Sequence, residues 1–286
     1  MQQNYIISLT STPARFEFIE PALKSLLAQT IKPERVILYI NRHYARYPDW
    51  DGTLPDVPEG VEVKIVDEDY GPATKLLPAL KEYWGQDKEI LFLDDDQVYK
   101  PFLAERFFRA REKHPDACIS TSGMDDYDTP DNAPRAFYPR PRSLRNWRIT
   151  DVGFQIKMLW RDVKSIFADK AIPEPTRRLV LRPGYADGFE GFGGVLVRPT
   201  FFAEEVFDIP EFAKPVDDVW LSGHAMRKGH PAWIIGGYLE PVLEAQMLET
   251  HKNENALHRS VFNNKDRDVS NSEVVRYFQE KYQIWL

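Results

Sequence analysis

The sequence contains few of the features that mark disulfide-stabilised, secreted or membrane-spanning proteins. Its 286 residues include a single cysteine, Cys118, so neither an internal disulfide nor a cysteine-based zinc cluster can form. No run approaches the roughly 18 apolar residues that a membrane-spanning helix requires. The first residues, MQQNYIISLTS, have neither the basic start nor the long apolar stretch of a signal peptide. We therefore expect a cytoplasmic protein.

Positive charge is also scarce. The chain has 37 Lys and Arg against 44 Asp and Glu, a formal net charge of −7. Binding to nucleic acid rests on a basic surface that neutralises phosphates, so we expect no nucleic-acid partner, although a local basic patch remains compatible with the composition. Hydrophobic residues make up 43% and charged residues 28%. This balance is typical of a folded globular chain with a sizeable core.

Short apolar segments alternate with helical ones and predict the fold class. Segments rich in β-formers lie at residues 5–11, 35–40, 61–66, 89–94, 117–122 and 232–235. Helical spacing occurs at residues 16–29, 73–84, 101–114, 215–229 and near 272–283. This alternation predicts an α/β fold in which a mostly parallel central sheet is flanked by helices. There is no internal repeat or low-complexity linker, which favours one continuous domain.

Three consecutive aspartates, Asp94, Asp95 and Asp96, lie where the buried strand predicted at 89–94 ends. Ligands of open α/β sheets bind beyond the carboxyl ends of strands. Adjacent carboxylates oppose one another's ionisation unless a cation lies among them. Their oxygens suit Mg²⁺ or Mn²⁺, which in turn favours phosphate oxygens. The position therefore favours a cation and nucleotide-diphosphate site over the alternative, a solvated turn that caps the helix at 101.

Other polar residues and glycines also follow predicted strands. Thr10 leaves the first strand, where it could contact a nucleotide or serve the start of the next helix, and Asp67 leaves the third. Lys75 lies near a helix start, which the helix dipole disfavours for a cation unless it binds an anion. The glycine-rich stretch 183–199 matches neither a phosphate-binding Walker loop nor a dinucleotide fingerprint. Gly193 and Gly194 in it would let backbone approach a ligand closely, or form an ordinary turn.

Two further groups have both a functional and a structural interpretation. Asp217 and Asp218 lie in the first turn of the predicted helix at 215–229, where acids are favourable to the helix dipole. A carboxylate there could also act as a general base on a hydroxyl. His251 lies in a late polar segment, near His258. A lone histidine is more often structural than a ligand, but neutral imidazole suits Mn²⁺.

Taken in sequence order, these motifs resemble those of GT-A-fold glycosyltransferases, closest to the family-two enzymes and with similarities to the β-1,3-galactosyltransferase type. The resemblance covers roughly residues 4–255. It rests on four landmarks in sequence order, which are the DxD motif at Asp94–Asp96, the glycine loop at Gly191–Gly194, the xED motif at Val216–Asp218 and the late metal-binding His251.

The resemblance implies a single GT-A domain over residues 1–286, with a nucleotide-binding half at 1–122 and an acceptor-binding half with a C-terminal tail at 123–286. It implies Mn²⁺ or Mg²⁺ bound by Asp96 and by His251, or by His258 in its place. It also implies a donor site lined by Thr10, Asp67, Lys75, Asp94, Asp95, Gly193 and Gly194.

The implied activity is that of a metal-dependent inverting glycosyltransferase of the hexosyltransferase type. A nucleotide-sugar, with UDP as the expected carrier, would donate to a hydroxyl of a glycan or lipid-linked glycan, as in polysaccharide biosynthesis. Asp218 would be the base, but the motif has aspartate where glutamate is usual, so Asp217 and Asp218 could exchange roles. A sugar-phosphate nucleotidyltransferase would usually carry a basic glycine-rich loop after the first strand, and TSTPAR has no glycine. A non-catalytic carbohydrate-binding protein would not need all these carboxylates and His251.

One basic segment stands out in this acidic chain. Residues 135–148 interleave five arginines with aromatic residues, namely Arg135, Phe137, Tyr138, Arg140, Arg142, Arg145, Trp147 and Arg148. Its prolines predict a loop, and charge runs are often simply solvated. The functional alternative is a lid, an acceptor contact or a peripheral contact with lipid headgroups at the inner face of the membrane.

Overall fold

The structure is a computed structural model that describes residues 4–124, 139–166, 172, 174–243 and 267–286. Its centre is an eight-stranded sheet with the order β10-β13-β6-β12-β4-β1-β2-β3. These strands are β1 (Tyr5–Thr10), β2 (Arg35–Asn41), β3 (Val61–Val66), β4 (Glu89–Phe92), β6 (Cys118–Ser120), β10 (Gly184–Ala186), β12 (Val195–Val197) and β13 (Ala232–Ile234).

Most neighbouring strands of the sheet are parallel. The run β3-β2-β1-β4 is parallel throughout, and β6 is parallel to β13. Strand β12 is antiparallel to both of its neighbours, and β10 is antiparallel to β13. Strands β4 and β12 are buried at every residue, as expected for strands that are covered on both faces. The α/β fold class predicted from the sequence is confirmed.

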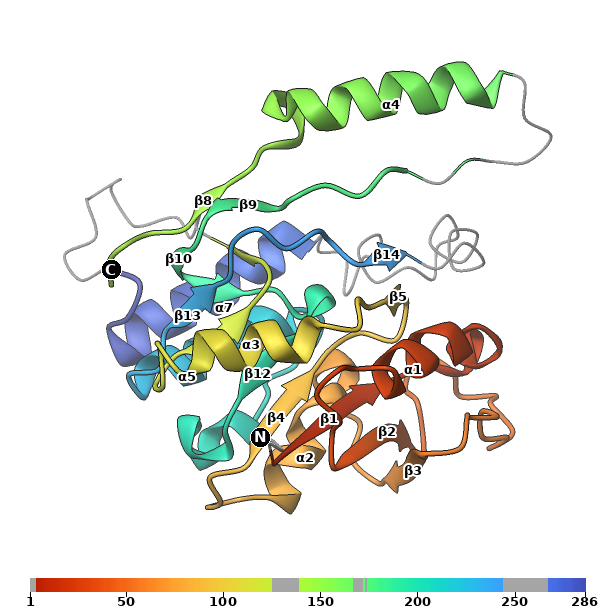
Figure 1. Cartoon of the computed structure of the whole chain (residues 1–286). Helices are drawn as coiled ribbons and strands as arrows, with labels where there is room; N and C mark the ends of the chain where they lie inside the picture. The colour runs from red at the N-terminus through yellow and green to blue at the C-terminus, as the bar shows by residue number, and fades with distance from the viewer. Residues whose placement is uncertain (1–3, 125–138, 167–171, 173, 244–266) are drawn as a thin grey trace.

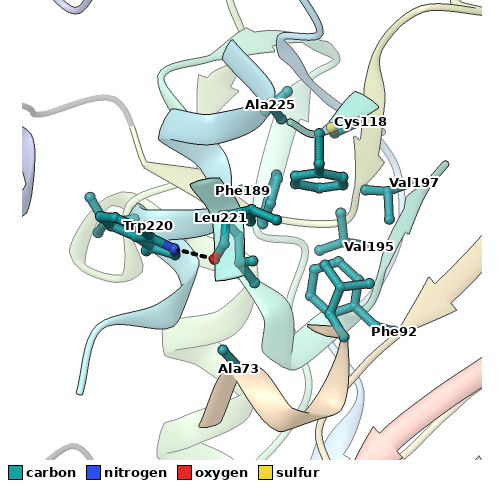
Figure 2. Packing of buried hydrophobic residues seen from close by; sticks show 14 of the residues in the cluster. Ala73, Phe92, Cys118, Phe189, Val195, Val197, Trp220, Leu221 and Ala225 are labelled. Carbon is teal, nitrogen blue, oxygen red and sulfur yellow. Dashed lines mark hydrogen bonds between the residues drawn. The ribbon is translucent and has the colours of Figure 1, made fainter. Parts of the chain in front are cut away.

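Helices cover both faces of the sheet (Figure 1). Leu23 of α1 (Glu20–Leu27) and Phe107 of α3 (Leu103–Arg111) belong to one buried cluster. Leu80 of α2 (Leu77–Glu82), Trp220 of α5 (Asp217–Arg227) and Phe278 of α7 (Arg267–Tyr282) belong to the other. Figure 2 shows part of this second cluster, in which the Trp220 indole N–H donates to a backbone carbonyl at 2.9 Å.

Two of the predicted helices are each divided into a 3₁₀ turn and an α-helix. The segment predicted at 16–29 begins within η1 (Pro13–Phe18) and continues as α1. The segment predicted at 73–84 begins within η2 (Gly71–Lys75) and continues as α2. Pro21 and Pro78 lie at the starts of the α-helices. Because proline has no backbone N–H, it cannot continue the hydrogen bonds of a preceding helical turn.

The segment after residue 139 contains structure that the sequence did not predict. Helix α4 (Val152–Ser165) was not expected. Strand β8 (Leu144–Arg145), which lies inside the predicted arginine-rich loop, pairs with β9 (Val180–Arg182). The loop prediction is therefore wrong at residues 144–145. Arg135, Phe137 and Tyr138 lie outside the described residues.

Small strand pairs and 3₁₀ turns complete the described chain. Strand β7 (Gly123–Met124) pairs with β11 (Gly188–Phe189), and β5 (Gln97–Val98) pairs with β14 (Val242–Leu243). The central sheet takes strands from both sides of residue 122, although the division into a nucleotide-binding and an acceptor-binding half stays a prediction. Among the helices described, none has both the length and the apolar character that crossing a bilayer requires.

Candidate active site

Six of the predicted site residues, Lys75, Asp94, Asp95, Asp96, Asp217 and Asp218, lie beyond the carboxyl end of β4 and around the start of α5. Strand β4 ends at Phe92, and the aspartate turn, Asp94 to Asp96, follows directly. Asp217 and Asp218 open α5, in its first turn, and both are buried. Lys75 ends η2, the 3₁₀ turn that precedes α2, and is also buried. Residues more than 120 positions apart in the sequence therefore meet at one edge of the sheet, where α/β proteins bind ligands.

Lys75 is the centre of one ion-pair network. Its Nζ lies 2.9 Å from Asp94 Oδ1, 2.9 Å from Asp217 Oδ2 and 3.6 Å from Asp218 Oδ1. The Ser8 hydroxyl of β1 donates to the Lys75 carbonyl at 2.6 Å and fixes the backbone beneath the side chain. Asp94 is the most exposed member of the network, with 31% of its side chain exposed. Solvent therefore reaches the network on that side.

The network changes the proton affinities of Lys75 and Asp218. Burial opposes the charge on Lys75, but the carboxylates of Asp217, Asp94 and Asp218 outweigh it and raise the Lys75 pKa well above its ordinary value. Burial raises the pKa of Asp218 to about 7, against the attraction of Lys75 and with the repulsion of Asp217. A carboxylate whose pKa lies near neutrality is suited to accept a proton at physiological pH.

The geometry distinguishes the two neighbouring acids of α5. Asp217 Oδ2 is in direct contact with Lys75 Nζ, whereas Asp218 accepts a hydrogen bond from the Gly191 N–H at 3.1 Å through Oδ2. That bond joins α5 to η5 (Gly191–Gly193), the first turn of the glycine loop. A Cβ at Gly191 would lie 2.6 Å from Lys75 Nζ and 2.9 Å from Asp218 Oδ1. A side chain at 191 would therefore displace Lys75 or Asp218, because the backbone here packs directly against the network.

The two glycines chosen from the sequence have a different local reason to be glycine. A Cβ at Gly193 would lie 1.9 Å from Thr121 Oγ1, and Gly194 has a φ of +93°, a conformation that favours glycine. The first reason is packing and the second is backbone conformation, and both lie within the protein. Their predicted approach to a nucleotide stays a prediction, and Gly191, which contacts the acids, was the glycine that sequence reasoning did not single out as a site residue.

A second cation, Arg15, pairs with the rest of the aspartate turn. Its Nη1 lies 3.0 Å from Asp95 Oδ1, and its Nη2 donates to Asp96. Burial raises the pKa of Asp95 to about 6, and the positive charge of Arg15 opposes this shift. The three aspartates are therefore divided between Lys75, which faces Asp94, and Arg15. The sequence analysis missed Arg15, although it is the only basic residue in the TSTPAR segment that leaves β1.

Buried Tyr99 connects the aspartate turn to the glycine loop. Its hydroxyl lies 2.8 Å from the carbonyl oxygen of Asp94 and 3.0 Å from that of Phe192. It was also missed, since no sequence pattern marks a tyrosine that bonds two backbone carbonyls 98 residues apart. The contact holds the two loops at a fixed separation.

The predicted metal ligands do not form a metal centre within the described residues. There, no group of three or more His, Cys, Asp or Glu side chains could hold a metal ion. Asp96, the expected ligand, is paired with Arg15. His251 and His258 lie outside the described residues. Asp96 could hold a cation only if Arg15 moved and if a bound diphosphate, or those histidines, supplied further ligands.

Two predicted nucleotide contacts are engaged elsewhere. The Thr10 hydroxyl donates to the Tyr39 carbonyl at 2.8 Å across the β1–β2 pair. Asp67, at the end of β3, is mostly exposed and forms an ion pair of 2.5 Å with Arg42 Nε. The hydrogen bond from Arg42 lowers the Asp67 pKa. Their role toward a nucleotide stays a prediction.

Comparison with known proteins gives distant structural likenesses. No family model matches the sequence, and no curated protein matches it. The chain is similar to S. aureus TarS 1–349 in complex with UDP, with a TM-score of 0.43, 10% identity, and coverage of 96% of this chain and 70% of that chain. A second structure, of S. aureus TarS 1–349, has a TM-score of 0.41 and 10% identity, and the match covers 96% of this chain and 70% of that chain. A third, of S. aureus TarS, has a TM-score of 0.41 and 10% identity, and the match covers 100% of this chain and 44% of that chain. Function has to be inferred from the site itself.

Proposed function

We propose that this chain is a glycosyltransferase that moves a hexosyl group from a nucleotide-sugar, with UDP as its expected carrier, to a hydroxyl of a glycan or lipid-linked glycan. The observation that carries the proposal is Asp218. This buried carboxylate, with a pKa raised to about 7, lies beside the cation Lys75 at the ligand-binding edge of the sheet. A base poised near neutrality next to a fixed cation suits transfer between a phosphate-linked sugar and an alcohol.

The proposed reaction assigns one chemical task to Asp218. Its carboxylate accepts the proton of the acceptor hydroxyl while that oxygen attacks the anomeric carbon. The bond from this carbon to the donor diphosphate breaks, and its electron pair leaves with the diphosphate. Attack opposite the leaving group inverts the anomeric centre. Gly191 keeps the Asp218 carboxylate oriented through its N–H, and Asp217 holds Lys75 beside it.

The aspartate turn and the two cations form the proposed donor site. Arg15 and Lys75 offer the charge that diphosphate oxygens need, and an arginine fork can bind two of those oxygens together. Asp94 is the most exposed member of the Lys75 network, which supports its proposed role as the contact to the ribose. Asp96 would hold Mn²⁺ or Mg²⁺, which when bound supplies Lewis acidity to the departing diphosphate. Arg15 would then leave Asp96 and pair with a phosphate of the donor instead.

Replacement of Asp218 tests the proposal directly. Asp218→Asn should bind UDP as the wild type does but lose transfer by about 10²–10⁴-fold, because an amide cannot accept the proton. Asp217→Asn is the matched comparison, because it makes the same carboxylate-to-amide change in the neighbouring acid, which could exchange roles with Asp218. A panel of nucleotide-sugars with and without Mn²⁺, with calorimetry of UDP binding, measures both properties.

The alternatives predict different products in the same assay. Release of pyrophosphate from a nucleoside triphosphate and a sugar phosphate would identify a nucleotidyltransferase. Sugar binding without turnover of any donor would identify a carbohydrate-binding protein. A larger loss of transfer in Asp217→Asn than in Asp218→Asn would assign the base to Asp217.

A further inference from the structure

Helix α4 presents an apolar face that the described protein does not cover. Five large apolar residues of the helix are between 43% and 70% exposed, namely Val152, Ile156, Leu159, Trp160 and Val163. Their spacing of three, four and seven residues places them on one side of an α-helix. Helices that belong to a protein core bury such a face, whereas no described residue covers this one.

The opposite side of α4 fixes how the helix is held. Phe154 is its one buried residue and lies against the guanidinium groups of Arg148 and Arg177, with centroid distances of 5.1 and 6.0 Å. The Asp151 side chain caps the first turn by accepting from the Phe154 N–H at 3.0 Å. Figure 1 shows α4, in green at the top, raised away from the central sheet. The exposed face therefore points outward on an anchored helix.

Further apolar residues lie on the segments that carry α4. Ten of the sixteen exposed large hydrophobic residues in the described chain fall within residues 144–181; outside α4 they are Leu144, Trp147, Ile149, Ile166 and Leu181. Single exposed apolar residues are normal on a protein surface, but a concentration on one protruding part marks an interaction surface. We refer to residues 139–182 as the α4 arm.

The α4 arm is strongly basic although the whole chain is acidic. Its described residues include ten Arg and Lys against three Asp and Glu, whereas the chain has a net charge of −7. On α4 itself, Lys157 and Lys164 flank Trp160 at spacings of three and four residues. The apolar face is therefore bordered by positive charge on one side.

We propose that the α4 arm docks on an anionic lipid bilayer, with the helix lying in the plane of the surface. The apolar face would enter the boundary between headgroups and acyl chains, as in other interfacial amphipathic helices. Lys157 and Lys164 would reach the lipid phosphates, since long basic side chains extend to the headgroup layer. The acidic remainder of the chain would be repelled from the same surface, which orients the protein.

Electrostatics favours a membrane over a second copy of the chain. Two α4 faces packed against each other as an antiparallel pair would bring Lys157 and Lys164 of one copy beside the same lysines of the other, and like charges at close range are destabilising. Elsewhere in the described chain, the exposed large apolar residues are scattered over separate elements, at Leu54, Ile65, Phe102, Leu239, Val269 and Leu286. They offer α4 no matching apolar face on another copy.

The inference does not rest on the proposed reaction, because membrane binding is measured without any substrate. If the proposed function also holds, docking would bring the site to lipid-linked acceptors. The test uses the full chain in co-sedimentation with vesicles of phosphatidylcholine alone, and with vesicles in which about a third of the lipid is phosphatidylglycerol. The wild type should bind the anionic vesicles and not the neutral ones.

Two sets of variants separate the apolar and the charged contributions. The triple change Ile156→Ser, Leu159→Ser and Val163→Ser should lower the partition coefficient at least about tenfold, whereas Leu54→Ser with Ile65→Ser should not change it. Lys157→Ala with Lys164→Ala should lower it by roughly tenfold or more at low salt, and Lys24→Ala with Lys32→Ala is the control. Circular dichroism and melting temperature confirm folding of each variant.

Several results would overturn the inference. Equal binding to neutral and anionic vesicles, or no binding to either, would exclude docking on an anionic membrane. Unchanged partition in the triple serine variant would show that α4 is not the contact. Self-association that the serine changes abolish, in a protein that does not bind vesicles, would identify α4 as an interface between copies of the chain.

Discussion

Replacing Asp218 by asparagine should make the protein more stable at alkaline pH while it removes the proposed base. The wild-type carboxylate is buried, and its pKa is raised from 3.8 to about 7 in the folded state. Its ionised form is therefore disfavoured by folding. Asparagine has the same shape, can still accept from the Gly191 N–H, and carries no charge to bury.

The sign and size of the effect follow from proton linkage. Between about pH 4 and pH 7 the folded protein binds a proton at Asp218 more readily than the unfolded chain does, so the wild type loses stability as pH rises through this window. A shift of about three pKa units corresponds to roughly 4 kcal/mol in the free energy of unfolding. That cost is fully present above pH 7 and absent in Asp218→Asn. We expect the variant to be more stable than the wild type by about 2–4 kcal/mol at pH 8 and by little at pH 4.

Asp217→Asn is the control for this experiment and should have the opposite effect. It removes the carboxylate that lies 2.9 Å from the buried Lys75 Nζ. Breaking one contact of a buried ion pair is destabilising, here by up to about 3 kcal/mol because Asp94 and Asp218 still face the lysine.

Urea unfolding at pH 5, 6, 7 and 8 measures both variants beside the wild type. The difference between wild type and Asp218→Asn should grow with pH and level off above pH 7. A difference in unfolding free energy that stays constant across this pH range would refute the conclusion that burial raises the pKa of Asp218. A variant that is less stable than the wild type at pH 8 would refute it as well.

Three further changes test the rest of the site. Arg15→Ala should destabilise the protein by about 3 kcal/mol, because it leaves buried carboxylates without their cation; Mn²⁺ should restore part of the melting temperature, and no restoration would contradict a cation site at the aspartate turn. Gly191→Ala should lower transfer about tenfold or more by displacing Asp218, whereas Gly153→Ala on α4 should leave kinetics unchanged. Tyr99→Phe should lower the free energy of unfolding in urea by about 1 kcal/mol and lower kcat. An unchanged kcat would show that the contacts of the Tyr99 hydroxyl with the two carbonyls are not needed for transfer.

Three of the strands were predictable because short continuous apolar segments indicate buried strands. The segments at 5–11 and 35–40 became β1 and β2, and the segment at 89–94 became β4 with the aspartates just beyond it. The segment at 61–66 became β3, which has no buried residue and was predictable from its content of β-forming residues instead. Local sequence alone shows that a residue lies at the end of a strand, without any knowledge of its contacts elsewhere in the chain. The edge of the sheet at which the site lies could therefore be inferred from the sequence alone.

The pairing of charges at this edge was not predictable in the same way. Lys75 was expected to face a nucleotide, which stays a prediction. In the structure it pairs with Asp94 and with Asp217, which lies 142 residues after Lys75 in the chain. Arg15 lies close to Thr10 in sequence, yet only the tertiary structure brings it to Asp96. Such contacts depend on how loops fold over the sheet, and no periodic pattern encodes them.

Helix α4 shows a different reason for a missed prediction. Its apolar residues have helical spacing, and Asp151 precedes it as a cap, so the local signal was present. The segment follows a stretch rich in proline and arginine, and those residues favoured a loop. An apolar face that no described residue covers also breaks the expectation that helical periodicity points to a core.

The charge of the site makes opposite predictions for donor binding with and without metal. Asp94, Asp95, Asp96 and the two acids of α5 outnumber the two cations, Lys75 and Arg15, so a nucleotide diphosphate meets net negative charge unless a divalent cation accompanies it.

Removing one carboxylate should therefore help metal-free binding and harm metal-dependent binding. In Asp96→Asn the diphosphate meets one negative charge fewer, which is worth about 1 kcal/mol at an intermediate dielectric, or about fivefold in the Kd for UDP without metal. The same change removes the proposed ligand, so Mn²⁺ should no longer tighten UDP binding. Calorimetry with and without Mn²⁺ measures both effects, and Asp162→Asn, a change in an exposed acid of α4 that pairs with Arg161, is the control. If Mn²⁺ tightened UDP equally in Asp96→Asn and in the wild type, the cation would be held without Asp96, and the exchange of Arg15 for a metal at this residue would be wrong.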